Sequence, residues 1–313
     1  MSKKIYFPNQ PQLPFDEWDD DLASGRETPS VAAPKPLYFC SFGSGSSGNS
    51  CYIGSREGGL ILDVGIKAEE IERGLAANGV SMNHVKGILL THDHADHVKY
   101  VYALLRNNRH LKLFCTNRVL NGILRRHSIS KRIKEYHVPI FKEIPFKVLD
   151  FDITAFDVPH DGTDNMGFSI EFDSRRFVLA TDLGEVTDRA RYYMSRATYL
   201  MIESNYDAQM LRFGRYPEYL KARIASSSGH LDNRQTAAFL FEILNPELKQ
   251  IFLCHLSKDN NTPQIALQTV KEALERKGIK VGNALETLED RQADVQLAAL
   301  PRFDMTRWFV FRN

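Results

Sequence analysis

The sequence predicts an α/β fold with two β-sheets, and two observations lead to this prediction. From Pro36 onwards, short apolar runs typical of buried strands alternate with segments of helical periodicity. The number of these runs favours two sheets over one. The predicted strands contain LYFCSF, CYIG, LILDVG, GILLTH, FDITAF, GFSIEF, RFVLATD, TYLMIES and QIFLCH, and helices are predicted over residues 68–77 and about 263–276.

The chain divides into a short arm and one domain. Residues 1–35 contain several prolines, the acidic run Asp19 to Asp21 and a polar stretch from Ser24 to Ser30, so they offer little apolar surface to bury. We predict an extended N-terminal arm over 1–35 and a single domain over 36–313. Of the 313 residues, 43 % are apolar, which is enough for a substantial core.

Charge and composition exclude some classes of protein. The 40 Lys and Arg nearly balance the 39 Asp and Glu, so a polyanion would have to bind at a local basic patch. No apolar run approaches the roughly 20 residues of a membrane span, and the start has no apolar signal core, so we expect a cytoplasmic location and no membrane partner. The four cysteines lie far apart, as expected of reduced thiols. Composition does not indicate an oligomeric state.

A cluster of histidines and aspartates carries the predicted chemistry. The run GILLTHDHADH places His92, His94, Asp96 and His97 directly after a predicted buried strand. Neutral imidazole and carboxylate are the ligands that zinc, manganese and iron accept. In such a loop His92 and His94 can point one way, and Asp96 and His97 another at the start of the next helix. The spacing therefore predicts two adjacent divalent metal ions, zinc or manganese, with iron as a further candidate.

Later strands end in further metal-ligating residues. His160, Asp182 and His255 each follow an apolar run, and Asp63 closes an earlier one. Any one of these is commonly an ordinary cap or a buried, hydrogen-bonded histidine, but together they supply the ligands that a second metal site needs. Asp63 would accept a hydrogen bond from a ligand histidine or from metal-bound water.

The order of these residues resembles the metallo-β-lactamase superfamily from residue 37 onwards. Four finer features narrow the resemblance to its YycJ branch, also called WalJ or VicX: the loop Gly43 to Ser50, the segment Glu203 to Tyr206, the segment Gly229 to Asn233 and the segment Leu256 to Pro263. The sequence departs from that branch at Asp232, where serine is expected, and in its longer N-terminal arm.

The resemblance implies a fold and an activity. The fold would be an αββα sandwich of two mixed β-sheets flanked by helices, with the metals at one edge. His92, His94 and His160 would hold one ion, Asp96, His97 and His255 the other, and Asp182 would bridge them. The branch is regarded as metal-dependent 5′ to 3′ DNA exonucleases, so DNA, as a single strand or a 5′ end, is the expected partner, with a role in DNA repair. A metal-bridging hydroxide would attack the phosphodiester.

Residues around the metals are expected to select the substrate. The predicted catalytic residues are Asp96, Asp63 and His230, where His230 could protonate a departing alkoxide or hold a phosphate. The alternatives are an ordinary surface-loop histidine at His230, a plain β-turn at Gly43 to Ser50 and solvated helix faces at the two basic groups described below. The predicted substrate contacts are Ser44, Ser46, Asn49, Asn205, His230, Lys258 and Asn261. Two basic groups are also candidates for holding a strand: Arg118, Arg125, Arg126, Lys131, Arg132 and Lys134, and Arg212, Arg215, Lys221 and Arg223 with Tyr206, Phe213, Tyr216 and Tyr219 interleaved.

Three alternatives remain open at this point. Thioesterases and lactonases share the His-x-His-x-Asp-His cluster, a phosphodiesterase could act on RNA or a small cyclic nucleotide, and the fold could serve as a non-catalytic binding module. The segment between Asn205 and His230 is too short for the inserted domain of β-CASP nucleases, which disfavours that class.

Overall fold

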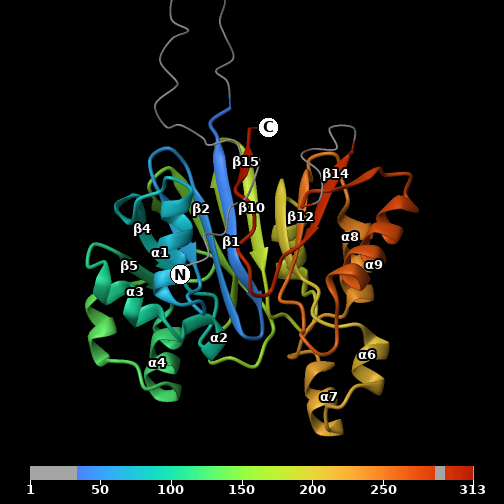
Figure 1. The fold of residues 1–313 in the computed structure, drawn as a ribbon, viewed down its shortest axis with the longest axis horizontal. Coiled ribbons are helices and arrows are strands. Elements are labelled where there is room, and N and C mark those ends of the chain that lie inside the picture. The colour runs from blue at the N-terminus through green and yellow to red at the C-terminus, as the bar shows by residue number, and fades with distance from the viewer. Residues whose placement is uncertain (1–33, 286–292, 313) are drawn as a thin grey trace, which may run out of the picture.

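Two mixed β-sheets form the centre of the molecule in the computed structural model, which describes residues 34–285 and 293–312 (Figure 1). The predicted fold class is confirmed. The predicted arm lies outside the described residues except for Pro34 and Lys35, so its boundary stays a prediction. The seven-stranded sheet has the order β15 (Phe309–Phe311), β1 (Leu37–Gly45), β2 (Gly48–Gly54), β3 (Gly59–Leu62), β4 (Val85–Leu89), β5 (Lys112–Cys115) and β6 (His137–Pro139). The eight-stranded sheet has the order β13 (Val281–Asn283), β14 (Val295–Ala299), β12 (Gln250–Cys254), β11 (Tyr199–Glu203), β10 (Arg175–Ala180), β9 (Met166–Phe172), β8 (Phe151–Asp157) and β7 (Phe146–Val148).

Each sheet combines an antiparallel half with a parallel half. In the first sheet β1, β2 and β3 pair antiparallel, and β3 to β6 run parallel. In the second, β7 to β10 pair antiparallel, and β10, β11, β12 and β14 run parallel. The carboxyl ends of parallel strands lie at the same edge of a sheet, which is where binding sites form in α/β proteins.

Helices cover the outer face of each sheet (Figure 1). The apolar side chains of α1, α3 and α4 belong to the core of the first sheet, and those of α5, α8 and α9 pack on the second. The helices are α1 (Ala68–Ala77), α2 (Ala95–Val98), α3 (Val101–Asn107), α4 (Asn117–Arg126), α5 (Asp188–Met194), α6 (Ala208–Phe213), α7 (Glu218–Ile224), α8 (Asn233–Ile243) and α9 (Pro263–Glu275), with short 3₁₀ turns at Met82–His84 and Lys131–Glu135.

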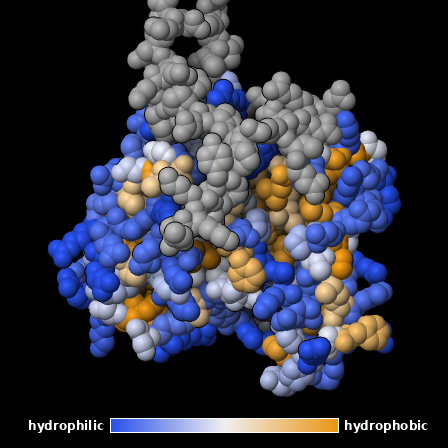
Figure 2. Space-filling view, in the orientation of Figure 1, coloured by the Kyte–Doolittle hydropathy of each residue, from blue (hydrophilic) through white to orange (hydrophobic). Residues whose placement is uncertain are grey.

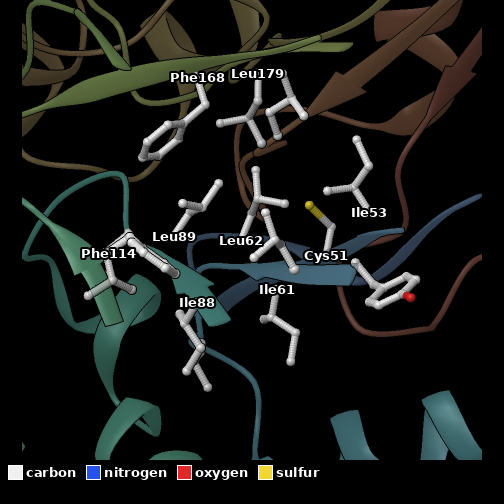
Figure 3. Close-up of a cluster of buried hydrophobic side chains, with 14 of the residues drawn as sticks. Cys51, Ile53, Ile61, Leu62, Ile88, Leu89, Phe114, Phe168 and Leu179 are labelled. Carbon is white, nitrogen blue, oxygen red and sulfur yellow. The ribbon is translucent and has the colours of Figure 1, made fainter. Parts of the chain in front are cut away.

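The alternation of side chains along the strands fills both sides of the first sheet. Leu62 and Leu89 point towards Phe168 and Leu179 of the second sheet, whereas Ile61 and Ile88 point to the opposite side, where the helices lie (Figure 3). Phe39 of β1 crosses the same interface, with its ring centroid 5.1 Å from that of Phe177 and 4.6 Å from that of Phe252. Aromatic packing therefore joins the two sheets directly.

The Ser/Gly-rich segment forms the hairpin between β1 and β2. Gly45 pairs with Gly48, which leaves Ser46 and Ser47 as a two-residue turn. Among the described helices, none has the length and apolar character needed to span a membrane.

Candidate active site

The predicted metal-ligating residues converge at the carboxyl ends of the strands. The loop after β4 and the first turn of α2 supply His92 to His97, and Asp63 follows β3. From the other sheet, His160 follows β8, Asp182 follows β10 and His255 follows β12 directly. Both sheets therefore contribute to one site, as expected from strands that end at a common edge.

Three of these residues have a backbone conformation that non-glycine residues rarely adopt. The φ angles of Asp63, Asp182 and His255 are 58°, 53° and 54°. The backbone N–H of Asp63 donates to Leu89 O at 2.9 Å, and that of His255 donates to Ser44 Oγ at 2.9 Å. Strained backbone of this kind persists where the surrounding structure fixes it, and it clusters at functional sites.

One group consists of His92, His94 and His160, whose ligand atoms lie within 4.8 Å of one another. His94 Nδ1 lies 3.3 Å from His160 Nε2, and the buried Nε2 of His92 has no hydrogen-bond partner. His160 donates from Nδ1 to Gly229 O at 3.0 Å, while His94 Nε2 lies 3.3 Å from Asp161 Oδ1. The outer nitrogens are thus engaged, and the inner ones are left to bind a cation.

A second group consists of Asp96, His97 and His255. Asp96 Oδ2 lies 3.5 Å from His97 Nε2 and 3.4 Å from His255 Nε2, and the latter nitrogen is buried without a hydrogen bond. On its other side His97 Nδ1 lies 2.8 Å from Asp63 Oδ2. Asp63 also accepts hydrogen bonds from the N–H and the hydroxyl of Thr91, at 2.9 and 2.8 Å.

Asp182 lies between the two groups. Its Oδ1 is 3.6 Å from His160 Nε2 and 3.2 Å from His255 Nδ1, and its Oδ2 is 3.2 Å from His97 Nε2. The side chain is 3 % exposed. This is the position that a carboxylate shared by two cations would occupy.

The electrostatics of the site differ between the two groups. Burial lowers the pKa of His92 and His94, so these imidazoles are neutral. Burial alone would also lower the pKa of His97 and His255, but neighbouring carboxylates, Asp182 first, outweigh it. They raise the pKa of His97 well above its ordinary value and that of His255 to about 10. The carboxylates around the second group therefore favour positive charge at this position, whether it is carried by a proton or by a cation.

Sequence reasoning assigned no role to Glu203, which closes β11. Its side chain is fully buried, and Oε1 lies 2.8 Å from the Nδ1 atoms of both His230 and His255. Oε2 accepts from the backbone N–H groups of Leu183 and Leu231 at 3.1 and 3.2 Å. The signal was present in TYLMIES, an apolar run that ends in a carboxylate like the run before Asp182. Asp161, which faces His94, was missed for lack of such a signal.

The predicted substrate contacts fall into two sets. Ser46 and Lys258 are exposed, and His230 is partly exposed, so these three can meet a substrate. Ser44, Asn49 and Asn205 are buried and bond to the site residues themselves, through His255 N–H, Asp96 Oδ2 and His255 O respectively. They position the site from within.

Asn261 requires a correction. It is 1 % exposed and donates to Ser204 O, Asn205 O and Asn233 Oδ1 at 2.9 to 3.0 Å. Its own Oδ1 accepts from Asn233 Nδ2 and from the N–H of Thr262. Since both polar atoms are fully engaged inside the protein, Asn261 holds the loop after β11 and does not contact a phosphate.

The donor set fits a divalent metal centre. It consists of buried imidazoles and carboxylates, and two of the imidazole nitrogens, His92 Nε2 and His255 Nε2, are buried without a hydrogen-bond partner. Such orphaned buried nitrogens are rare unless a ligand satisfies them.

Comparison with known proteins agrees with this geometry. The profile described as beta-lactamase superfamily domain matches residues 70–255, and the chain belongs to this superfamily. It is a metal-dependent hydrolase of the metallo-β-lactamase fold. Within the superfamily it is similar to exodeoxyribonuclease YycJ of Bacillus anthracis, with 34 % identity over 256 residues that cover 80 % of this chain and 94 % of the relative. Exodeoxyribonuclease WalJ of Streptococcus pneumoniae is 33 % identical over 240 residues, covering 76 % and 88 %. The expected branch is thus confirmed.

A solved structure agrees on the fold. The metallo-β-lactamase fold protein YhfI from Bacillus subtilis superposes with a TM-score of 0.63 at 13 % identity, covering 88 % of this chain and 100 % of that one.

Proposed function

We propose that the protein is a phosphodiesterase that binds two divalent cations, zinc or manganese with iron as a further candidate, and shortens DNA from its 5′ end. The observation that carries the proposal is the pair of ligand groups with Asp182 between them. The names of the YycJ and WalJ relatives support DNA as the substrate. A role in DNA repair and a cytoplasmic location stay predictions.

Each group has its own set of residues. His92, His94 and His160 would hold one cation, Asp96, His97 and His255 the other, and Asp182 would contact both. When bound, such a pair lowers the pKa of a shared water and neutralises charge on a phosphoryl group. The protein fixes the ligand orientations: Asp63 accepts the Nδ1 proton of His97, and Gly229 O accepts that of His160.

His230 is the best-placed residue to move a proton to the leaving group. Its imidazole is 19 % exposed at the site, while its partner Glu203 is fully buried. With Nδ1–H donated to Glu203, the ring has a fixed orientation, and Nε2 remains to meet the departing oxygen. Asp182 Oδ1 lies 3.8 Å from His230 Nδ1, so this ring is adjacent to the predicted bridging carboxylate.

The test uses purified protein stripped by a chelator and reloaded with Mn²⁺ or Zn²⁺. A single strand labelled at its 5′ end should release labelled mononucleotide first, and blocking that end should stop digestion. His94→Ala should remove the activity, whereas His84→Ala, which changes an exposed histidine outside the site, should retain it. Turnover of a thioester or lactone without cleavage of any phosphodiester would refute the proposed phosphodiesterase activity. Faster cleavage of RNA or a cyclic nucleotide than of DNA would refute DNA as the substrate.

A further inference from the structure

The α6–α7 arm, defined as residues 208–224, carries the most exposed large apolar side chains in the described part of the chain. Phe213 is 78 % exposed and Tyr219 is 77 % exposed. Figure 2 shows hydrophobic surface over α6 next to hydrophilic side chains. The other two aromatic residues of the predicted group are occupied: Tyr206 is buried, and the hydroxyl of Tyr216 donates to Asp259 at 2.8 Å.

The arm is also basic, with four Arg or Lys and one Glu between residues 208 and 224. Lys221 is paired with Glu218 at 3.0 Å. Arg212 and Arg215 have no carboxylate partner within residues 34–285 and 293–312. The guanidinium of Arg212 lies 5.4 Å from the ring centroid of Phe213, so an unneutralised cation accompanies an exposed ring. Unpaired guanidinium groups beside exposed aromatic rings are the composition of surfaces that bind single strands.

Two contacts attach this arm to the active site. Arg223 of α7 donates to Asp161 Oδ2 at 2.6 Å, and Asp161 Oδ1 lies 3.3 Å from His94 Nε2. The loop after α7 supplies Gly229, whose carbonyl accepts from His160. In Figure 1, α6 and α7 project from the same end of the molecule as α2, which carries Asp96 and His97. A strand held on the arm would therefore extend to the site.

We propose that the α6–α7 arm is the platform that holds a single-stranded DNA end, with bases stacked on Phe213 and Tyr219 and phosphates bound by Arg212 and Arg215. This inference rests on the proposed function and adds the device that makes a strand a better substrate than a small phosphodiester. Every base offers a π-face, so the platform binds without regard to sequence. A protein partner is less consistent with the arm, because the exposed rings are accompanied by Arg212 and Arg215, which have no carboxylate partner among the described residues.

The experiment measures binding of a fluorescent single strand with phosphorothioate linkages, which slow cleavage, to the metal-loaded protein. Phe213→Ala and Tyr219→Ala should each weaken binding about tenfold. An abasic strand of equal length should bind the wild type as weakly as the base-containing strand binds the double variant that combines Phe213→Ala and Tyr219→Ala. Arg212→Gln and Arg215→Gln should weaken the binding of both the base-containing and the abasic strand. Each should also reduce the salt dependence of binding by about one phosphate contact.

Tyr192→Ala is the matched control. Tyr192 is an exposed aromatic residue on α5 with the Arg196 guanidinium 3.7 Å from its ring centroid. Arg196 lies near Arg175 and Arg176, at the opposite end of β10 from Asp182. Tyr192→Ala should therefore leave strand binding unchanged. Melting temperature and metal content verify that the Phe213 and Tyr219 variants are folded.

The outcomes separate the two proposals. If the wild type shortens no DNA, the proposed function fails. If the wild type shortens DNA and the double variant binds and shortens it equally well, the platform alone is refuted. A double variant that converts a dimer into a monomer without losing strand affinity would assign the rings to a second copy of the chain and would also refute the platform.

Discussion

Replacing Asp63 with asparagine tests whether this residue controls the nitrogen that His97 presents to the site. Asp63 Oδ1 accepts the Thr91 N–H, and Oδ2 faces both the Thr91 hydroxyl and His97 Nδ1. Asparagine keeps the shape and tolerates the positive φ, but it has one acceptor oxygen. If that oxygen keeps the backbone N–H, the amide NH₂ faces His97 Nδ1.

Two donors then face each other, and His97 must move its proton to Nε2, the nitrogen beside Asp96 and Asp182. A proton there competes with a metal ion for the same lone pair. Losing a carboxylate that orients a ligand histidine typically lowers metal affinity about 10- to 100-fold, or about 1.4 to 2.7 kcal/mol. We expect this loss for one of two bound ions.

The assay is competition for Zn²⁺ between the metal-free protein and a chromogenic chelator. Asp152→Asn is the control, because Asp152 is exposed and pairs with Lys147 away from the site. Unchanged affinity for both ions in Asp63→Asn would refute the orienting role. A melting temperature that falls in the metal-free variant would instead indicate a folding defect.

Four further predictions concern stability, metal content and reactivity. Phe39→Ala should cost about 3 to 5 kcal/mol in denaturant unfolding, because Phe39 is fully buried between the sheets; a cost under 1 kcal/mol would contradict that packing. Gly65→Ala should lower both the melting temperature and the metal content, since an added Cβ would lie 1.6 Å from the backbone oxygen of Asp96. A variant that melts at the wild-type temperature would contradict this close approach of residue 65 to Asp96. Burial raises the pKa of the thiols, to about 12 for Cys40 and Cys115. Thiol reagents at pH 8 should therefore react with four cysteines in denaturant and with almost none in the native protein. Rapid labelling of the native protein would contradict the burial of these thiols. Because the unfolded chain releases these protons first, the free energy of unfolding should fall as the pH rises above about 9.

The strand ends were the part of the site that the sequence could predict. His160, Asp182 and His255 each follow an apolar run, and strands that run in the same direction through a sheet bring such positions to one edge. The orientation of a polar side chain was not predictable in the same way. Asn261 and Lys258 lie in the same loop, yet the structure turns the amide into the protein and the ammonium to solvent. That difference depends on contacts with Asn233 and Ser204, which are distant in sequence.

Residues that contact the predicted ligand histidines were harder to identify from the sequence. Asp161 follows His160 directly. Its role depends on contacts with His94, which follows a strand of the other sheet, and with Arg223 of α7. Glu203 had the same sequence signal as Asp182 but received no role, because a strand-end carboxylate alone does not reveal its partners. Such pairings arise from tertiary packing, so local pattern does not encode them.

The left-handed backbone at Asp63, Asp182 and His255 sets stability against activity. Glycine would relax each of these positions at no steric cost, while removing the side chain that the site needs. In a screen for heat resistance, this relaxation competes with the loss of buried hydrogen bonds such as those that Asp63 accepts from Thr91. Asparagine, which tolerates the same conformation, is the substitution that separates the two effects, and a thermostabilised version of this hydrolase should keep all three residues fixed.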